Sequence, residues 1–447
     1  MSRSFFLMCL LFYPDIAVSN LVNKFGSRTD IETRVIELRR QFKTQKVDLI
    51  TRRSYANALY QLGEMNKAYE SHGKFLKASA TPEDLLLGAN TALALMRLER
   101  AEQLFNSLYG HDGFRSQAMK GLILVYYHQQ NFQKISKLNT DEIPSDLEPL
   151  ARYLKLFEGQ PYQIQWNNQN HIAQVNFVND IYAPAALPEL IVIVNGVEML
   201  LTLDTGGDRL YLDESLAEKA QIRIITDTQS KYAYTGGKVV KEPLGVAHTV
   251  QLGNVELRNV PVTVAQWKAN GPTTDGVLGT AILKQFLTTI DYKNSKIIFR
   301  PRGSQTPIQS ISRGREMTSI PFFLASTHLM IAKGQLNDRT KLNFFVDSGL
   351  AATMPLVMVE ETVSFLRLEK NAIPNQPYYW VSIDKHGLTG MLKGPTQALG
   401  NVFVDQDMHT KLGFLLDILI SHQYLREFED WTIDFDSMTF YFPKITS

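Results

Sequence analysis

Two segments in the second half of this 447-residue chain follow one plan, and this repetition limits the possible folds most strongly. Each segment has two short apolar runs and then an Asp-Thr/Ser-Gly triplet. The runs are 190–194 and 199–203 in the first copy, and 329–331 and 341–346 in the second. The triplets are Asp204-Thr205-Gly206 and Asp347-Ser348-Gly349, and an Asn195-Gly196 turn joins the runs of the first copy. Apolar runs separated by such turns predict β-hairpins.

Three further similarities follow the triplets in the same order. Leu252-Gly253-Asn254-Val255 recurs as Leu399-Gly400-Asn401-Val402, the block 276–287 aligns without gaps on 414–425, and Thr289-Ile290-Asp291 recurs as Thr432-Ile433-Asp434. Several markers in one order are harder to obtain by chance than any single marker. The sequence therefore predicts two related all-β units, over residues 172–301 and 316–443.

An Asp-Thr/Ser-Gly triplet by itself is typical of a β-turn, in which Asp caps the turn and Gly supplies a positive φ. Here each triplet ends an apolar strand and is followed by a new apolar run. A later Val277-Leu278-Gly279 is also present. Together these features resemble the pepsin/retropepsin superfamily of aspartic peptidases, in its bilobed single-chain form, over roughly residues 172–443.

The resemblance implies that Asp204 and Asp347 are a catalytic pair. Thr205 and Ser348 would anchor the two loops, and Gly206 and Gly349 would let backbone N–H groups reach the carboxylates. Two adjacent carboxyls cannot both ionise cheaply, so the pair would share one proton and activate a water for peptide-bond hydrolysis. The expected substrate is a peptide or protein, and the chemistry needs no cofactor and no metal.

The resemblance also implies a flap, a hairpin that closes over the substrate. Tyr232, Tyr234, Thr235, Gly236 and Gly237 lie in the expected interval between Asp204 and Val277. Aromatic residues followed by glycines suit a mobile tip. The alternative interpretation is an ordinary exposed hairpin turn.

Two departures from the family pattern bear on activity. In the ungapped alignment Asp417 stands opposite Gly279, which would put a third carboxylate near the pair. The residues after the triplets, Gly207 and Leu350, carry no hydroxyl to favour the ionised form. We therefore expect a raised pKa for the pair, with activity at weakly acidic to neutral pH. The alternative function is a catalytically inactive scaffold that binds peptides.

Residues 30–158 show apolar positions at helical spacing and few helix breakers. Three motifs, around Ala68, Ala101 and Ile135, recur at intervals of 33 and 34 residues. This period resembles degenerate tetratricopeptide repeats, whose stacked helix pairs present a surface for a protein partner. An unrelated helical bundle is the alternative. The predicted fold class is thus multidomain, with an all-α repeat followed by an all-β bilobed acid-protease fold.

Residues 1–19 have the layout of a signal peptide, with an early Arg3, an apolar run and Ala17-Val18-Ser19. A buried N-terminal helix is the alternative. No later apolar run is long enough for a stable membrane span, so we expect an exported protein, periplasmic or secreted. The net charge of +1 gives no reason to expect nucleic acid. The nine scattered histidines form no zinc motif.

Overall fold

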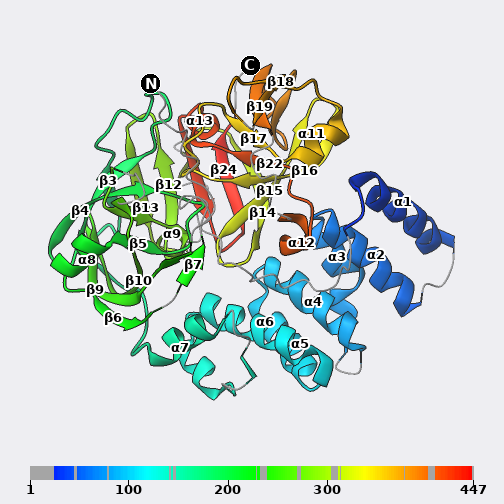
Figure 1. The fold of residues 1–447 in the computed structure, drawn as a ribbon, viewed down its shortest axis with the longest axis horizontal. Helices are drawn as coiled ribbons and strands as arrows, with labels where there is room; N and C mark the ends of the chain where they lie inside the picture. The colour runs from blue at the N-terminus through cyan, green and yellow to red at the C-terminus, as the bar shows by residue number, and fades with distance from the viewer. Residues whose placement is uncertain are drawn as a thin grey trace.

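The computed structural model describes residues 25–44, 48–77, 80–139, 142–143, 147–227, 229–231, 239–268, 273–303, 311–312, 314–376, 378–400 and 408–444. The predicted signal peptide (1–19) and the predicted flap residues (232–237) lie outside this set. An N-terminal helical region is followed by a β-rich region that contains a closed barrel (Figure 1). In Figure 1 the helices, blue to cyan, run along one side of both β-rich units.

The helical region is a series of packed helices. They are α1 (Arg28–Thr44), α2 (Leu49–Gln61), α3 (Met65–Ser71), α4 (Pro82–Ala94), α5 (Leu98–Tyr109), α6 (Arg115–His128) and α7 (Glu148–Leu156). The start of α4 shows how local sequence sets these boundaries. Thr81 and Asp84 form a capping box, and Pro82 occupies the first helical turn, where its missing N–H costs nothing.

The turns between paired helices repeat at the predicted interval. Gly63, Met96 and Gln130 have φ values of 69°, 54° and 54°, and they lie 33 and 34 residues apart. Each donates its N–H to the carbonyl three residues earlier, and the next residue donates to the carbonyl five residues earlier. This left-handed termination satisfies the last carbonyls of a helix. The helical region therefore contains three copies of one turn, while the resemblance to tetratricopeptide repeats stays a prediction.

The first β-rich unit is built on an eight-stranded sheet in the order β1-β10-β5-β11-β4-β3-β9-β6. Its strands are β1 (Gln163–Trp166), β3 (Glu189–Val194), β4 (Val197–Leu203), β5 (Leu210–Asp213), β6 (Arg223–Thr226), β9 (Leu244–Leu252), β10 (Val255–Ala265) and β11 (Gly276–Leu278). Pairing of β10 with β9 closes the barrel. Two helices, α8 (Glu214–Lys219) and α9 (Thr280–Leu283), complete the unit.

The second unit repeats this arrangement. Its elements are β14 (Met317–Ala325), β15 (Leu329–Leu336), β16 (Arg339–Val346), β17 (Leu356–Met358), α11 (Glu360–Leu366), β18 (Asn371–Ala372), β19 (Tyr379–Ile383), β20 (His386–Leu388), β21 (Thr396–Gly400), α12 (Met408–Leu412), β22 (Ile418–Ile420) and α13 (His422–Leu425). In both units the strand before the Asp triplet pairs in parallel with a later three-residue strand, β4 with β11 and β16 with β22.

A central sheet joins the two units. Its remaining strands are β2 (Ala173–Asn176), β12 (Leu287–Asp291), β13 (Lys296–Arg300), β23 (Asp430–Asp434) and β24 (Thr439–Pro443). Strands β12 and β23 pair antiparallel, and the hydroxyls of Thr289 and Thr432 meet at 2.8 Å. These two residues are 143 positions apart, the same separation as Thr205 and Ser348. The repeated unit is therefore related to its copy by an approximate twofold axis through this sheet.

Strand pairing corrects the predicted alignment of the two units. Leu203 pairs with Leu278, and Val346 pairs with Ile420, so Ile420 is the counterpart of Leu278. The ungapped match of 276–287 to 414–425 is thus wrong by four residues. Ser421, not Asp417, occupies the place of Gly279.

The Leu252 and Leu399 marker is also wrong. Leu252 ends β9 at a hairpin with β10, whereas Leu399 lies in β21, which pairs in parallel with β17. In the first unit the counterpart of β17 is β5, and the strand that pairs in parallel with β5 is β10. Short Leu-Gly-Asn-Val motifs suit several turns, so their identity alone did not locate equivalent strands.

The helical region packs against both β-rich units. Leu244 and Val246 of β9 belong to the apolar core of the later helices. Leu59 and Leu87, from α2 and α4, share a second core with strand residues of the other unit, such as Phe345. Part of the surface that had been predicted to take a separate partner is therefore covered by the chain's own strands.

Candidate active site

The two aspartates follow equivalent strands at the centre of the β-rich region. Asp204 follows β4, and Asp347 follows β16. Their backbone N–H groups donate to equivalent carbonyls, Asp204 to Leu278 and Asp347 to Ile420, both at 3.1 Å. Both side chains are buried, with 6% of Asp204 and 0% of Asp347 exposed.

The two triplets interlock through reciprocal hydrogen bonds. Thr205 Oγ1 donates to the Val346 carbonyl at 3.0 Å and accepts the Ser348 N–H at 2.9 Å. Ser348 Oγ donates to the Leu203 carbonyl at 3.2 Å and accepts the Thr205 N–H at 3.0 Å. Each hydroxyl thus donates one hydrogen bond to the other loop and accepts one from it. This exchange fixes the relative position of residues that are 143 positions apart.

Glycines let the loops approach the carboxylates closely. Asp204 Oδ1 accepts the N–H groups of Gly206 at 2.7 Å and Gly207 at 3.1 Å, and Asp347 Oδ1 accepts that of Gly349 at 2.9 Å. A Cβ atom at Gly206 would collide with the Asp347 carboxyl, and one at Gly349 would collide with that of Asp204. Each carboxyl therefore lies against the backbone of the opposite loop, where only glycine fits.

The two carboxyls are within hydrogen-bonding reach of one another. Burial raises the pKa of Asp204 to about 6, and hydrogen bonds from Asp347, Gly206 and Gly207 oppose that rise. Desolvation disfavours an ionised carboxyl, whereas N–H donors favour it. Since the effect of burial dominates, the pair keeps a proton at pH values well above the usual pKa of an aspartate side chain.

Asp417 lies away from this pair. It is the counterpart of Asp275, because each aspartate accepts the N–H of a strand residue four positions before a triplet aspartate. Asp275 accepts from Leu200 at 2.8 Å, and Asp417 from Asn343 at 2.7 Å. The expectation that Asp417 would place a third carboxylate at the pair is wrong, since the alignment beneath it was shifted by four residues.

A buried polar cluster that the sequence did not reveal adjoins the first loop. Asp208 accepts from the Tyr127 hydroxyl at 3.2 Å and from Arg209 Nε at 3.1 Å. Lys284 Nζ donates to His128 Nδ1 at 3.0 Å and to the Thr327 carbonyl at 3.1 Å. The only sequence signal was an acid–base dipeptide, Asp208-Arg209, one residue beyond the triplet. The partners come from α6 and from the turn between β14 and β15, so spacing could not identify them.

Burial sets the protonation states in this cluster. It raises the pKa of Asp208 to about 6, while the positive charge of Lys284 opposes the rise. Burial also lowers the pKa of Lys284 to about 8 and keeps that of His128 well below its usual value. His128 is therefore neutral at physiological pH and can accept a hydrogen bond through Nδ1.

The remaining predictions concern the flap, metal ions and membrane spans. The predicted flap falls between β7 (Gln229–Lys231) and β8 (Val239–Lys241), which pair antiparallel, but the flap residues themselves are outside the described set. Among the residues that the structure describes, no group of three or more His, Cys, Asp or Glu side chains is placed to hold a metal ion. Within the same ranges, no helix has both the length and the apolar character needed to cross a membrane.

Comparison with known proteins supports the aspartic peptidase superfamily at the level of the domain. Residues 190–282 match a family model described as aspartyl protease. This match spans β3 to α9, and so contains Asp204 and the Val277-Leu278-Gly279 segment. A search of curated proteins found no match to this chain.

Similar solved structures include two basic 7S globulins and one protease. Basic 7S globulin from soybean is 11% identical, with a TM-score of 0.39, over 64% of this chain and 96% of that chain. Conglutin gamma from lupine seeds is 11% identical, with a TM-score of 0.41, over 62% and 96%. A retropepsin-like aspartic protease from Rickettsia conorii is 18% identical, with a TM-score of 0.22, over 31% and 92%.

Proposed function

We propose that this protein is an aspartic endopeptidase whose catalytic pair is Asp204 and Asp347. The observation that supports this most directly is the contact between the two carboxyls, held in place by the reciprocal hydrogen bonds of Thr205 and Ser348. Two carboxyls held this close share one proton, so one can act as a base while the other donates a hydrogen bond.

In the proposed reaction the ionised member of the pair takes a proton from a water molecule, which attacks the carbonyl carbon of the scissile peptide bond. The protonated member donates a hydrogen bond to the carbonyl oxygen and polarises it. As the new C–O bond forms, the protonated member passes its proton to the former carbonyl oxygen, which gives a tetrahedral diol. The C–N bond of the diol then breaks, the leaving nitrogen takes the proton that had been removed from the water, the carboxyl that gave up its proton takes one back from a diol hydroxyl, and two peptides are released. The pair titrates as a unit, so the roles belong to the pair.

The proposal includes the predicted organisation of the chain. Residues 172–301 and 316–443 form the two lobes of the peptidase, and residues 30–158 form a tetratricopeptide-like unit. The predicted flap, including Tyr232 and Tyr234, closes over a peptide substrate. The apolar segment at 1–19 directs export to the periplasm or beyond.

The proposal is tested by turnover of a mixed peptide library. We expect Asp204→Asn and Asp347→Asn each to reduce cleavage to background, and a statine-type inhibitor to block the unaltered protein. Asp384→Asn is the matched control, because Asp384 is exposed and distant in sequence from both triplets. Peptide binding without any turnover in the unaltered protein would instead support the scaffold function.

A further inference from the structure

We infer that Arg28, in the first turn of α1, is a positioning residue for Asp347. Its guanidinium neutralises Asp417, which holds the strand leading to Asp347. The catalytic part of this inference rests on the proposed peptidase function. The structural part, that the N-terminal helix stabilises one half of the site selectively, can be tested without any activity.

The two halves of the site use equivalent aspartates with different counter-ions. Asp275 pairs with Lys268, seven residues earlier, whose side chain is 43% exposed. Asp417 is buried, with 2% of its side chain exposed, and its counter-ion is Arg28, 389 positions away and 7% exposed. The first unit therefore neutralises its aspartate with a nearby surface lysine. The second unit relies on a helix from the other end of the chain.

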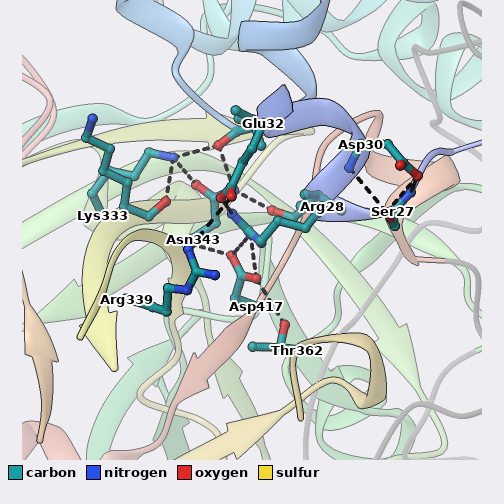
Figure 2. A network of polar contacts seen from close by, with 12 residues as sticks. Ser27, Arg28, Asp30, Glu32, Lys333, Arg339, Asn343, Thr362 and Asp417 are labelled. Atoms are coloured by element: carbon teal, nitrogen blue, oxygen red, sulfur yellow. Dashed lines mark hydrogen bonds and ion pairs between the residues drawn. The ribbon is translucent and has the colours of Figure 1, made fainter. Parts of the chain in front are cut away.

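The geometry of the Arg28 contact is that of a strong ion pair. One guanidinium nitrogen, Nη2, reaches both carboxylate oxygens of Asp417 at 2.5 Å. The same carboxylate accepts the Thr362 hydroxyl at 3.0 Å and the Asn343 N–H at 2.7 Å (Figure 2). The buried carboxyl of Asp417 therefore has a full set of hydrogen-bond and ion-pair partners.

Asn343 is the residue where contacts from the helical region converge. Its side-chain N–H donates to the Leu62 carbonyl at 3.2 Å, and its side-chain oxygen accepts from Lys333 Nζ at 2.6 Å. Lys333 Nζ also donates to the Leu62 carbonyl at 2.7 Å. Gly63 lies against the Asn343 amide so closely that a Cβ atom there would collide with it. Figure 2 shows Asn343 between Lys333 and Asp417.

The counterpart of Asn343 in the first unit is Leu200, which carries no side-chain amide for such bonds. Asn343 lies in β16, four residues before Asp347. A displacement of β16 would therefore change the position of one carboxyl relative to the other. Because catalysis depends on that relative position, such a displacement should lower kcat more than it raises KM.

Loss of Arg28 would leave a buried carboxylate without its counter-ion. Removal of one partner from a buried ion pair is far more disruptive than removal of both. The Asn343 N–H would then lose a firmly held acceptor, and β16 would lose a link to α1. Loss of Lys268 should have little effect, because water can reach Asp275 on the surface of the first unit.

The test compares Arg28→Met with the matched control Lys268→Met. The first measurement is amide hydrogen exchange in the full-length protein. We expect Arg28→Met to accelerate exchange in β16 about tenfold or more without a similar change in β4, and Lys268→Met to leave both strands unchanged. Adding Asp417→Asn to Arg28→Met should restore part of the protection, since it removes the unpaired charge.

The second measurement is kinetic, at a temperature where circular dichroism shows each variant fully folded. We expect Arg28→Met to lower kcat about tenfold to a hundredfold with little change in KM, and Arg28→Lys to have a smaller effect. If Arg28→Met does not fold, Arg28→Lys takes its place in both measurements, since it keeps the charge but cannot contact Glu32 and Asp417 through separate nitrogens.

The two proposals fail differently. Absence of turnover in the unaltered protein would refute the peptidase function, and hydrogen exchange would still decide the role of Arg28. Unchanged exchange in β16, or equal acceleration in β4 and β16, would overturn the role of Arg28. In an active enzyme, an unchanged kcat in the substituted protein would overturn it as well.

Discussion

At the residue scale, two opposing forces act on the carboxyl pair. Three backbone N–H groups, from Gly206, Gly207 and Gly349, stabilise negative charge. Burial disfavours the same charge, and it raises the pKa of Asp204 to about 6. The residues after the triplets provide no hydroxyl donor, since positions 207 and 350 are Gly and Leu. The raised pKa agrees in direction with what these two residues had predicted.

This balance predicts the pH dependence of turnover. The pair must hold one proton, and a carboxyl with a pKa raised to about 6 keeps that proton as pH rises to about 6 and loses it above. We expect kcat/KM to be highest in weak acid and to fall about tenfold per unit well above pH 6. The measurement is a pH–rate profile from pH 3 to 9. An optimum confined to strong acid, or a rate still rising at pH 8, would contradict the assignment.

At the scale of secondary-structure elements, helix α6 contacts the loop that follows Asp204 directly. Its last residues, Tyr127 and His128, contact Asp208 and Lys284 respectively. Asp208 lies two residues after Gly206, and its carbonyl accepts the Ala281 N–H of α9 at 2.6 Å. The end of α6 therefore supports both the loop and the helix that follows β11.

The contact between α6 and Asp208 can be tested with Tyr127→Phe. We expect a loss of about 1–3 kcal/mol in the free energy of unfolding, because a buried carboxyl loses a donor. Asp208 has a raised pKa, so its ionisation opposes folding, and its stabilising contribution present below pH 4 is lost as pH rises through about 6. Without the Tyr127 donor the pKa rises further.

The Tyr127→Phe defect should therefore be larger at pH 8 than at pH 4. The measurement is urea unfolding at the two values. Tyr182→Phe is the control, because Tyr182 is 52% exposed and its hydroxyl makes one long contact at 3.5 Å. A defect of equal size at both values would mean that the Tyr127 hydroxyl does not act through Asp208.

Sequence patterns predict some of these strands and turns, but not which strands are equivalent in the two units. The hairpin before Asp204 was predictable, because the Asn195-Gly196 turn suits a two-residue connection, and both residues have positive φ. The counterpart of Leu278 was not. Many apolar residues fit a buried strand equally well, so the chance identity of Leu416 with Leu278 led to an alignment four residues away from the true one. Only the hydrogen-bond register identifies Ile420.

At the scale of the whole molecule, the helical region is part of one folded body. The apolar positions of α2 and α4 were predictable from their spacing, but that spacing cannot say what covers them. The structure covers them with strands of the second β-rich unit. The pairing of Arg28 with Asp417 was equally hidden, since it joins residues 389 positions apart. Long-range pairing of this kind depends on the tertiary fold.

This shared core predicts that the helical and β-rich regions unfold together. The two can be followed separately in one sample, because all four tryptophans lie at or beyond position 166, whereas far-ultraviolet circular dichroism at 222 nm reports mainly on the helices. Leu59, in α2, is 3% exposed and packs in the core shared with the second unit. We expect Leu59→Ala to lower both thermal midpoints equally, for a cost of about 2–5 kcal/mol.

The matched control is Ile36→Ala, because Ile36 lies on α1 with 54% of its surface exposed, and its truncation should shift neither midpoint appreciably. If Leu59→Ala lowered the helical midpoint alone and left the tryptophan signal unchanged, the helices would be an independent unit. Coincident shifts would mean that a defect on the helical side of the interface reaches the strands that carry Asp347. The stability of the half-site around Asp347 would then depend on the helical region through apolar packing as well as through Arg28.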